Sequence, residues 1–214
     1  MRRYFWKIAC WLLVGWTCVA CEDEVDPLPA YVQTLAVLQV GTDVVRQTLT
    51  LVDGRTLGVL NPVGGFPADT LARVYAIYVE DEAKGGVRLY GLQRVFSPRA
   101  EAIPAEEMRR DPVKVISVWK TGTRWLNLHL GIMSGGQAHT CAFAEEWEAA
   151  VGDRPAKVRI TLYHDRGDDG EFYTEDAYLC CPLRHYADSL RAGVDSVEVR
   201  VQAYDGEVVR SFLY

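Results

Sequence analysis

An acidic stretch in the second half of the sequence has the residue types of a calcium-binding loop. It reads DRGDDGE over residues 165–171, and Asp176 follows shortly after. Ca²⁺ takes about six to eight oxygen ligands from a loop that turns at a glycine. However, Gly167 stands where the third position of an EF-hand loop needs an oxygen, and we expect strands on both sides. A solvated turn explains the same residues, so we predict no metal site. The calcium alternative consists of Asp165, Asp169, Glu171 and Asp176.

The four histidines do not have the spacing of a zinc site. The patterns HxH, HxxxH and HExxH are absent from the sequence, whereas zinc needs three or four convergent ligands. His164 falls at the apolar positions of an expected strand, so we predict a half-buried histidine that is hydrogen-bonded to a loop. His129 falls on the opposite side of its strand from the leucines, and we expect it to be exposed. His139 and His185 have no pairing spacing, so we predict no catalytic role for any histidine.

Serine and cysteine nucleophiles are also not supported by their surroundings. Ser134 lies among glycines at 131–136, but the spacing is not G-x-S-x-G and no helix follows, so we expect a hairpin turn between strands. Cys141 has no expected partner base. Strand alternation places Cys181 inward and Cys180 outward, and either of them could form a disulfide with Cys141. We therefore predict no catalytic residue and no cofactor, and a hydrolase with an unrecognised site remains the alternative.

The N-terminus carries signals for export and lipid attachment. A basic start is followed by an apolar stretch at 8–16, which is too short to span a bilayer, and by small residues. Val-Ala-Cys at 19–21 resembles the lipobox at which bacterial lipoprotein signal peptidase cuts, although Cys18 stands where leucine is usual. We predict a lipoprotein signal peptide at 1–20 and acylation of Cys21. An ordinary cleaved signal peptide is the alternative.

The residues after Cys21 predict a tether that also carries an address. Residues 21–30 combine four carboxylates with two prolines, which is typical of a solvated linker. In Bacteroides-type lipoproteins, acidic residues directly after the acylated cysteine accompany transfer to the outer face of the outer membrane. The tract Glu22, Asp23 and Glu24 resembles that pattern. We therefore expect a lipid-anchored outer-membrane protein that faces the cell surface, with a linker of no sorting role, or an inward-facing protein, as the alternatives.

Charge and composition exclude some classes of partner. Cleavage before Cys21 removes the three basic residues Arg2, Arg3 and Lys7, so the net charge falls from −6 to −9. Nucleic-acid binding normally needs clustered Lys and Arg, and no such stripe occurs. We predict no nucleic-acid partner. The hydrophobic content of 49% is enough for a packed core.

Alternating hydrophobicity predicts an all-β chain with two halves. The expected strands cover 32–40, 45–51, 56–60, 72–79 and 87–96 in the first half, and 113–119, 125–133, 139–143, 158–164, 172–181, 197–204 and 208–213 in the second. Three prolines in 97–112 mark the boundary. We predict a small antiparallel barrel at 31–99 and an antiparallel β-sandwich at 111–214, with one helical turn at 182–193.

The order of several short motifs resembles the NigD-like lipoproteins over nearly the whole mature chain. The motifs are LQV at 38–40, DGRTL at 53–57, RVYAIY at 73–78, Trp119, LNL at 126–128, and LYHD at 162–165 with Gly167-Asp168. This resemblance implies an N-terminal OB-type barrel before a C-terminal β-sandwich, in a family named after a bacteriocin-associated gene and without an established molecular function. The chain departs from the pattern at Cys180-Cys181, where serine and an apolar residue are expected.

Together these features predict a non-catalytic envelope lipoprotein that binds a protein or a glycan. A bacteriocin-immunity-like protein is the alternative. Four aromatic residues recur on the expected barrel strands, where OB-type barrels often stack sugars, peptides or bases. They are Tyr75, Tyr78, Tyr90 and Phe96. Packing in the core or on the sheet explains them equally well, so we predict no specific binding residues.

Overall fold

Strands make up the structure, as the alternating sequence predicts. The computed structural model describes residues 30–152 and 155–214, in which there are thirteen strands and one 3-10 turn. The described residues contain no helix with the length and hydrophobicity of a membrane span. The predicted signal peptide at 1–20, the lipidation site Cys21 and the acidic tract at 22–24 lie outside the described residues.

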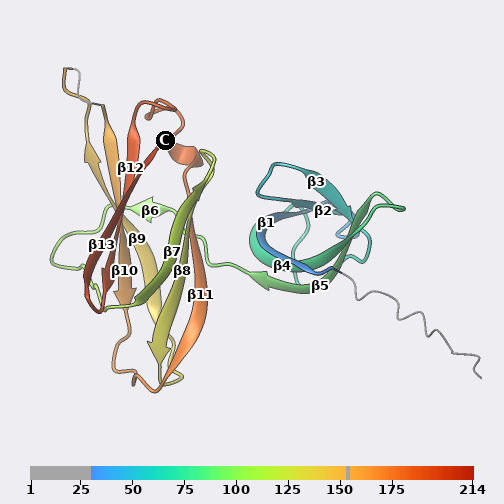
Figure 1. The fold of residues 1–214 in the computed structure, drawn as a ribbon, viewed down its shortest axis with the longest axis horizontal. Coiled ribbons are helices and arrows are strands. Elements are labelled where there is room, and N and C mark those ends of the chain that lie inside the picture. The colour runs from blue at the N-terminus through green and yellow to red at the C-terminus, as the bar shows by residue number, and fades with distance from the viewer. Residues whose placement is uncertain (1–29, 153–154) are drawn as a thin grey trace, which may run out of the picture. The chain divides into compact units, whose positions relative to one another are not determined.

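The first five strands form a closed barrel (Figure 1). They are β1 (Val32–Val40), β2 (Gln47–Thr50), β3 (Thr56–Val59), β4 (Leu71–Asp81) and β5 (Gly86–Arg94). The order is β1-β2-β3-β5-β4, and β1 closes the barrel by pairing with β4. The predicted Asp53-Gly54 turn joins β2 to β3, with Gly54 at φ 91°. At the parallel β3–β5 contact, a Cβ on Gly86 would lie 2.6 Å from the carbonyl oxygen of Gly58, so only glycine allows this closure.

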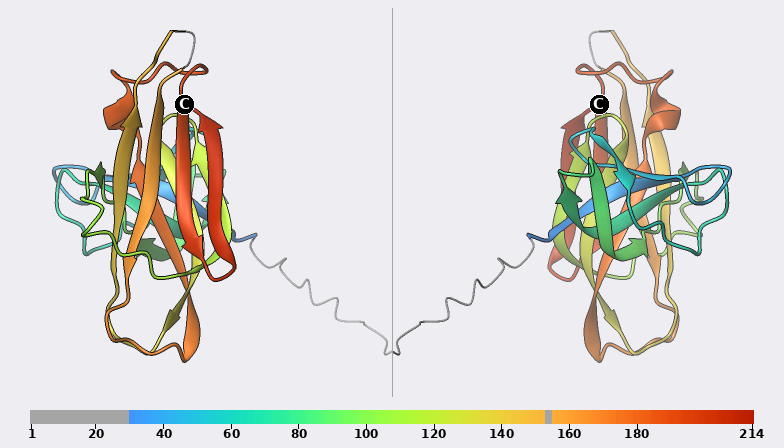
Figure 2. Two further views of the ribbon diagram at one scale, coloured as in Figure 1. Left: turned by 90° about the vertical axis from the view of Figure 1, so that its left-hand side faces the viewer. Right: turned by 90° about the vertical axis from the view of Figure 1, so that its right-hand side faces the viewer.

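The remaining strands form a two-sheet sandwich. They are β6 (Ala100–Glu101), β7 (Lys114–Thr121), β8 (Trp125–Ser134), β9 (Thr140–Glu148), β10 (Lys157–Asp165), β11 (Tyr173–Pro182), β12 (Ser196–Ala203) and β13 (Gly206–Leu213). One sheet has the order β13-β12-β10-β9-β6 and the other β11-β8-β7. The left view of Figure 2 faces the larger sheet, from yellow β9 to red β13. The predicted helical turn is present as a 3-10 turn, Arg184–Tyr186.

Two features of the sandwich differ from the simple antiparallel pattern. The pairs β10–β12 and β6–β9 are parallel. In addition, β6 lies inside the proline-containing segment 97–112, where the sequence predicts only a connection. Its two residues pair with Phe143 and Ala144 of β9, so the segment is part of the larger sheet. Such a short strand has too little alternation to be detected.

The sandwich core consists of alternate residues from the two sheets. Leu126, Leu128 and Leu130 of β8 belong to the same buried cluster as Val158 and Ile160 of β10, and all five are fully buried. Each such side chain contributes about 1.5–3 kcal/mol relative to an exposed one. Cys181 joins this cluster, as strand alternation predicts.

Cys180 points away from the sandwich core but is buried by the barrel. It forms a small cluster with Leu35 of β1 and Val95, which follows β5. Tyr31 to Tyr214 form one compact unit. The division into domains at 31–99 and 111–214 stays a prediction.

A buried arginine lies at this junction without a carboxylate partner among the described residues. Arg73 of β4 is 4% exposed, and its Nη2 donates to Oδ1 of Asn127 at 2.9 Å. Its guanidinium lies 4.9 Å from the ring centre of Trp125, while its Nε has no partner. Asn127 in turn donates from Nδ2 to Thr121 Oγ1. Burial lowers the pKa of Arg73. The side-chain amide of Asn127 and the ring of Trp125 are the contacts that offset the cost of burying this cation.

We expect Asn127→Leu to lower the free energy of unfolding by about 2–3 kcal/mol, because it leaves a buried charged donor unmet. The double variant Arg73→Met with Asn127→Leu should recover part of this loss, since both partners are then apolar. Urea denaturation of the single and double variants measures the coupling. A change below about 0.5 kcal/mol for Asn127→Leu would contradict a stabilising role for this contact.

Candidate functional site

A groove of about 430 Å³ opens at one edge of the sandwich. Within the described chain, β11 is the last strand of its sheet, and β9 is covered only by the two residues of β6. The groove lies between these incompletely covered edges. Its apolar lining includes Ile132, Cys141, Ala177 and Leu179. We call it the seam groove.

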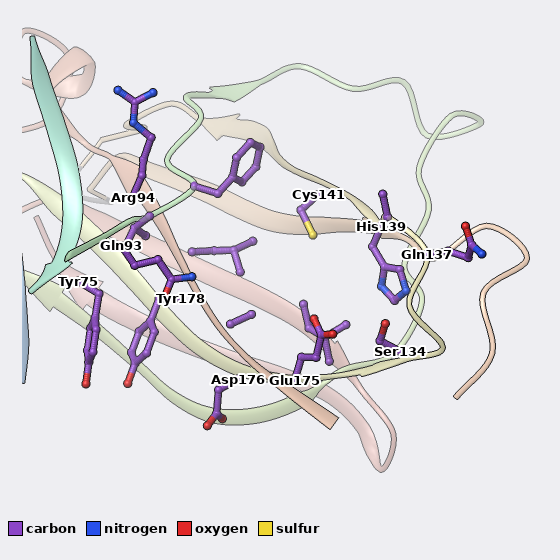
Figure 3. A pocket seen from close by; sticks show the side chains of 16 residues that line it. Tyr75, Gln93, Arg94, Ser134, Gln137, His139, Cys141, Glu175, Asp176 and Tyr178 are labelled. Atoms are coloured by element: carbon purple, nitrogen blue, oxygen red, sulfur yellow. The ribbon is translucent and has the colours of Figure 1, made fainter. Parts of the chain in front are cut away.

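The rim of the seam groove is polar and carries two carboxylates on neighbouring residues. Glu175 and Asp176 are exposed on β11. Figure 3 shows Glu175 directed into the groove and Asp176 directed to the other side of β11 with Tyr178, while His139 and Cys141 lie on the facing strand side. Arg94, at the end of β5, lines the same groove. The groove therefore has an apolar floor with mainly acidic groups beside the β11 edge.

One end of the seam groove is closed by a buried chain of polar contacts. His139 Nε2 lies 3.0 Å from Asp169 Oδ2, and His139 Nδ1 lies 3.0 Å from His164 Nε2. His164 Nδ1 reaches the carbonyl oxygen of Asp111 at 2.9 Å. Asp169 also accepts from the backbone N–H groups of Gly135 and Gln137 at 2.7 and 3.2 Å. These contacts join the segments around residues 111, 135–139 and 164–169.

The number of protons on the two imidazole rings limits how many of these three contacts can be hydrogen bonds. Asp169 and the Asp111 carbonyl are acceptors at its two ends, so three filled contacts require three protons on the two imidazole rings. Two neutral rings supply two. Burial lowers the pKa of His164, although the Asp111 carbonyl opposes the effect. The N–H of Gly135 is the main reason that the pKa of Asp169 lies far below its ordinary value. The network therefore joins an ionised carboxylate to two imidazole rings, and burial favours the neutral form of His164.

The comparisons with known proteins connect this architecture with a family. The family model described as NigD-like C-terminal beta sandwich domain matches residues 96–214. The chain belongs to the NigD-like family. The predicted resemblance and the predicted all-β fold of barrel and sandwich are thereby confirmed. A comparison with curated proteins finds no match.

Three solved structures show the same fold as this NigD-like protein. A NigD-like immunity protein from Bacteroides caccae has 24% identity and a TM-score of 0.65, over 86% of this chain and 98% of the other. A protein of unknown function from Bacteroides vulgatus has 16% identity and a TM-score of 0.68, over 86% and 91%. A protein provisionally named a lipoprotein, from Bacteroides fragilis, has 14% identity and a TM-score of 0.59, over 85% and 96%. Identities this low establish the fold alone.

The histidine predictions are partly right for this NigD-like protein. His164 is 2% exposed and contacts the loop at Asp111, as predicted in kind, although it is more deeply buried than expected. His139 lacks pairing spacing in sequence but meets His164 in the fold. His129 was expected to be exposed, which is wrong, because its ring stacks on Tyr178 with centres 4.3 Å apart.

The turn after Ser134 corrects another expectation. It does not form a hairpin, because it carries the chain from β8 in one sheet to β9 in the other. Ser134 Oγ donates to Asp169 Oδ2 at 3.2 Å. A Cβ on Gly135 would lie 2.7 Å from Asp169 Oδ1, so a glycine is required there. The glycine pair at 135–136 was the sequence signal for this close approach.

The four carboxylates of the calcium alternative have separate partners. Asp169 belongs to the histidine network. Asp165 accepts from the N–H of Gly167. Glu171 pairs with Arg166 and accepts from Tyr204, and Asp176 faces His129. Across the described ranges they form no group suited to a metal ion, so we do not propose a calcium site.

The cysteines are free thiols in the described part of the chain. The disulfide between Cys141 and Cys180 or Cys181, left open by the sequence, is therefore not present. Cys141 lines the seam groove, where burial raises its pKa to about 11. It therefore remains a protonated thiol at neutral pH.

The aromatic residues noted in the sequence do not form one stacking surface. Tyr78 is 2% exposed in the barrel core. Tyr75 stacks on Tyr178 with ring centres 4.8 Å apart, and Tyr90 contacts Tyr31 edge-on. Phe96 is half exposed at the seam groove. Packing explains the first three.

Acidification should destabilise this protein in two stages. The pKa of His164 is lowered on folding, so the stability of its neutral form is complete above about pH 6.5 and is lost as pH falls below that value. The pKa of Asp169 is also lowered, so its contribution is complete above its unfolded pKa of about 3.9 and is lost below it. Thermal midpoints between pH 7.5 and 3 should therefore fall twice.

The variant Asp169→Asn should melt at a lower temperature at pH 7 and show a smaller second stage, because Asp195 and Glu198 also have lowered pKa values and still contribute to it. Asp168→Asn, which alters an exposed neighbour, is the matched control and should keep both stages. An unchanged acid limb in Asp169→Asn would contradict this assignment.

Proposed function

We propose that this NigD-like protein is a lipid-anchored, non-catalytic module that binds a partner protein in the seam groove. The observation that supports the proposal is the groove itself, which combines an apolar floor with a polar rim between incompletely covered strand edges. Binding sites commonly have this combination of apolar area and a few placed polar groups.

The state of the nucleophiles in the groove supports binding rather than catalysis. Cys141 is a protonated thiol because its pKa is raised to about 11. His139 is the neighbouring imidazole, but both of its ring nitrogens are engaged, one by Asp169 and one by His164. Ser134 donates to Asp169 and accepts from the N–H of Gly136. Neither the serine nor the thiol therefore has a free base.

The aromatic packing favours a protein over a glycan. Sugars are commonly held against an open aromatic face, but the ring of Tyr178 stacks on both Tyr75 and His129. Both faces of Tyr178 are therefore used within the protein, which leaves Phe96 as the half-exposed aromatic ring of the groove. The apolar residues Ile132 and Leu179 lie next to exposed strand backbone instead, which suits the side chains of a polypeptide.

A bacteriocin-immunity-like role is the second candidate, and it is favoured by the names of two similar structures. One is the immunity protein from Bacteroides caccae. The other, from Parabacteroides distasonis, is provisionally named toxin-related, with 17% identity and a TM-score of 0.64 over 86% of this chain and 93% of the other. An immunity protein also binds a protein partner, so both candidates predict the same kind of ligand.

Filling the groove should abolish partner capture. Ala138 is exposed and lines the groove, so Ala138→Trp adds bulk there without disturbing the core. Val209→Trp on β13, at a position 40% exposed, is the matched control. Crosslinking on intact cells should give the same protein adduct with wild type and Val209→Trp, and none with Ala138→Trp. An adduct that survives in Ala138→Trp would move the site elsewhere, and retention of a glycan alone would identify the other ligand class.

The membrane anchor is part of the proposal and rests on the sequence. Two or more acyl chains on Cys21, at about 0.8 kcal/mol per buried CH₂, would hold the protein where one chain is marginal. The acidic tract at 22–24 motivates an outward-facing position on the outer membrane. The similar structure from Bacteroides fragilis that is provisionally named a lipoprotein agrees with a lipid anchor.

Cys21→Ser should release the protein from the membrane fraction, and mass spectrometry of the wild type should find an acylated N-terminal cysteine. Replacing Glu22, Asp23 and Glu24 by alanine should keep the anchor but protect the protein from proteinase added to intact cells. An unmodified Cys21 would refute the anchor, whereas a protected wild type would refute only the outward orientation.

A further inference from the structure

The outer edge of β11 presents backbone groups that have no strand beside them in the described structure. Leu183 N–H donates to Arg124 on the β8 side, whereas Cys180 N–H donates to the carbonyl of Phe96 on the outer side. Because backbone groups alternate along a strand, the N–H groups of Tyr178, Asp176 and Thr174 point outward like that of Cys180.

The chain itself begins to add a strand at this edge and then stops. Phe96 forms a single parallel bridge with Leu179. Before this bridge, Val95 packs into the junction cluster and Arg94 ends β5, so the chain leaves the β11 edge. The segment from Thr174 to Tyr178 is left open, and the seam groove lies beside it.

The cavity beside this edge suits an added strand. Five residues at about 3.3 Å each give an edge of roughly 16 Å. Side chains of an added strand would alternate between two surroundings. One set would face the apolar floor at Ile132 and Cys141, and the other would face Tyr178 on the outer surface. Figure 3 shows Cys141 Sγ directed into the groove.

The charges at the edge select the chemistry of the occupant. Glu175 and Asp176 are both exposed, and within the described ranges the side chain of Asp176 contacts only His129, at 3.3 Å. Lysine side chains on an incoming strand would complement them. Arg94 marks the other end of the groove, so the basic residues should lie near the Thr174 end.

We propose that the edge of β11 from Thr174 to Tyr178 takes up an extended, lysine-containing peptide segment of the partner protein as an additional strand. The inference rests on the proposed function, because it names how that partner is held. Main-chain hydrogen bonds supply affinity in this mode, and the alternating side chains supply specificity.

A proline at position 176 tests the strand addition directly. Asp176→Pro removes an outward N–H and leaves the ladder with β8 intact, since proline is tolerated on an edge. Asp176→Ala is the matched control, because it loses the same carboxylate but keeps the N–H. The probe is the capped peptide acetyl-Lys-Val-Thr-Val-Lys-Thr-amide, with Glu in place of Lys as its acidic analogue. Thermal melting establishes that both variants are folded.

We expect the lysine peptide to bind wild type more tightly than its acidic analogue. Asp176→Pro should bind it about fivefold or more weakly than Asp176→Ala, the factor that corresponds to one lost hydrogen bond. A peptide N-methylated on alternate residues should lose binding to wild type as well. On binding, amide hydrogen exchange should slow at Asp176 and Tyr178 but not at Glu175, whose N–H already faces β8.

Three outcomes would overturn the inference: equal binding by the two variants, equal binding by the N-methylated peptide, or no binding of the lysine peptide to wild type. The proposed function is tested separately with the crosslinked partner. If Ala138→Trp loses the partner and Asp176→Pro retains it, groove binding stands and strand addition is wrong. If Ala138→Trp retains the partner, the proposed groove function fails.

Discussion

The carboxylate of Asp169 determines how the seam groove is closed at one end. The chain crosses between the sheets twice in this region, from β8 to β9 and from β10 to β11. Asp169 lies on the second crossover and accepts two backbone N–H groups from the first. His139 and Ser134 also contact the same carboxylate. Because the carboxylate of Asp169 holds the two crossovers together, the distance between the two sheets at this end of the groove depends on this carboxylate.

The other end of the groove is held by packing rather than by a charge. The junction cluster consists of Cys180, Leu35 and Val95. Beside it, the backbone N–H of Cys180 donates to the carbonyl oxygen of Phe96. The stack of Tyr75 on Tyr178 extends this contact along the groove. Because both ends of the groove are fixed, the open stretch of β11 is already ordered before a ligand binds. Such preorganisation reduces the entropy lost on binding.

The sequence predicted the features that depend on local alternation. It did not predict the features that depend on which strands pair or on how one part of the fold covers another. Strand parity correctly placed Cys181 in the core and turned Cys180 away from it, but it could not show that the barrel covers Cys180. The contact between His139 and His164 joins residues 25 apart, one directly before β9 and the other on its neighbour β10, and alternation alone does not give the register of that strand pair. The two-residue strand β6 was missed for the same reason, because it is defined by its partner β9 alone.

The acidic residues on β11 have a second explanation, which also bears on the choice of partner. Exposed strand edges are aggregation hazards, and charged side chains on them prevent pairing with another copy. Two β11 edges brought together would place Glu175 and Asp176 against the same residues of the other copy, and like charges opposite each other are destabilising. A protective role alone, however, does not account for the apolar cavity beside the edge, lined by Ile132, Ala177 and Leu179. An edge that repels its own copy and adjoins an apolar cavity discriminates by charge, because the same carboxylates that exclude an acidic strand stabilise a basic one.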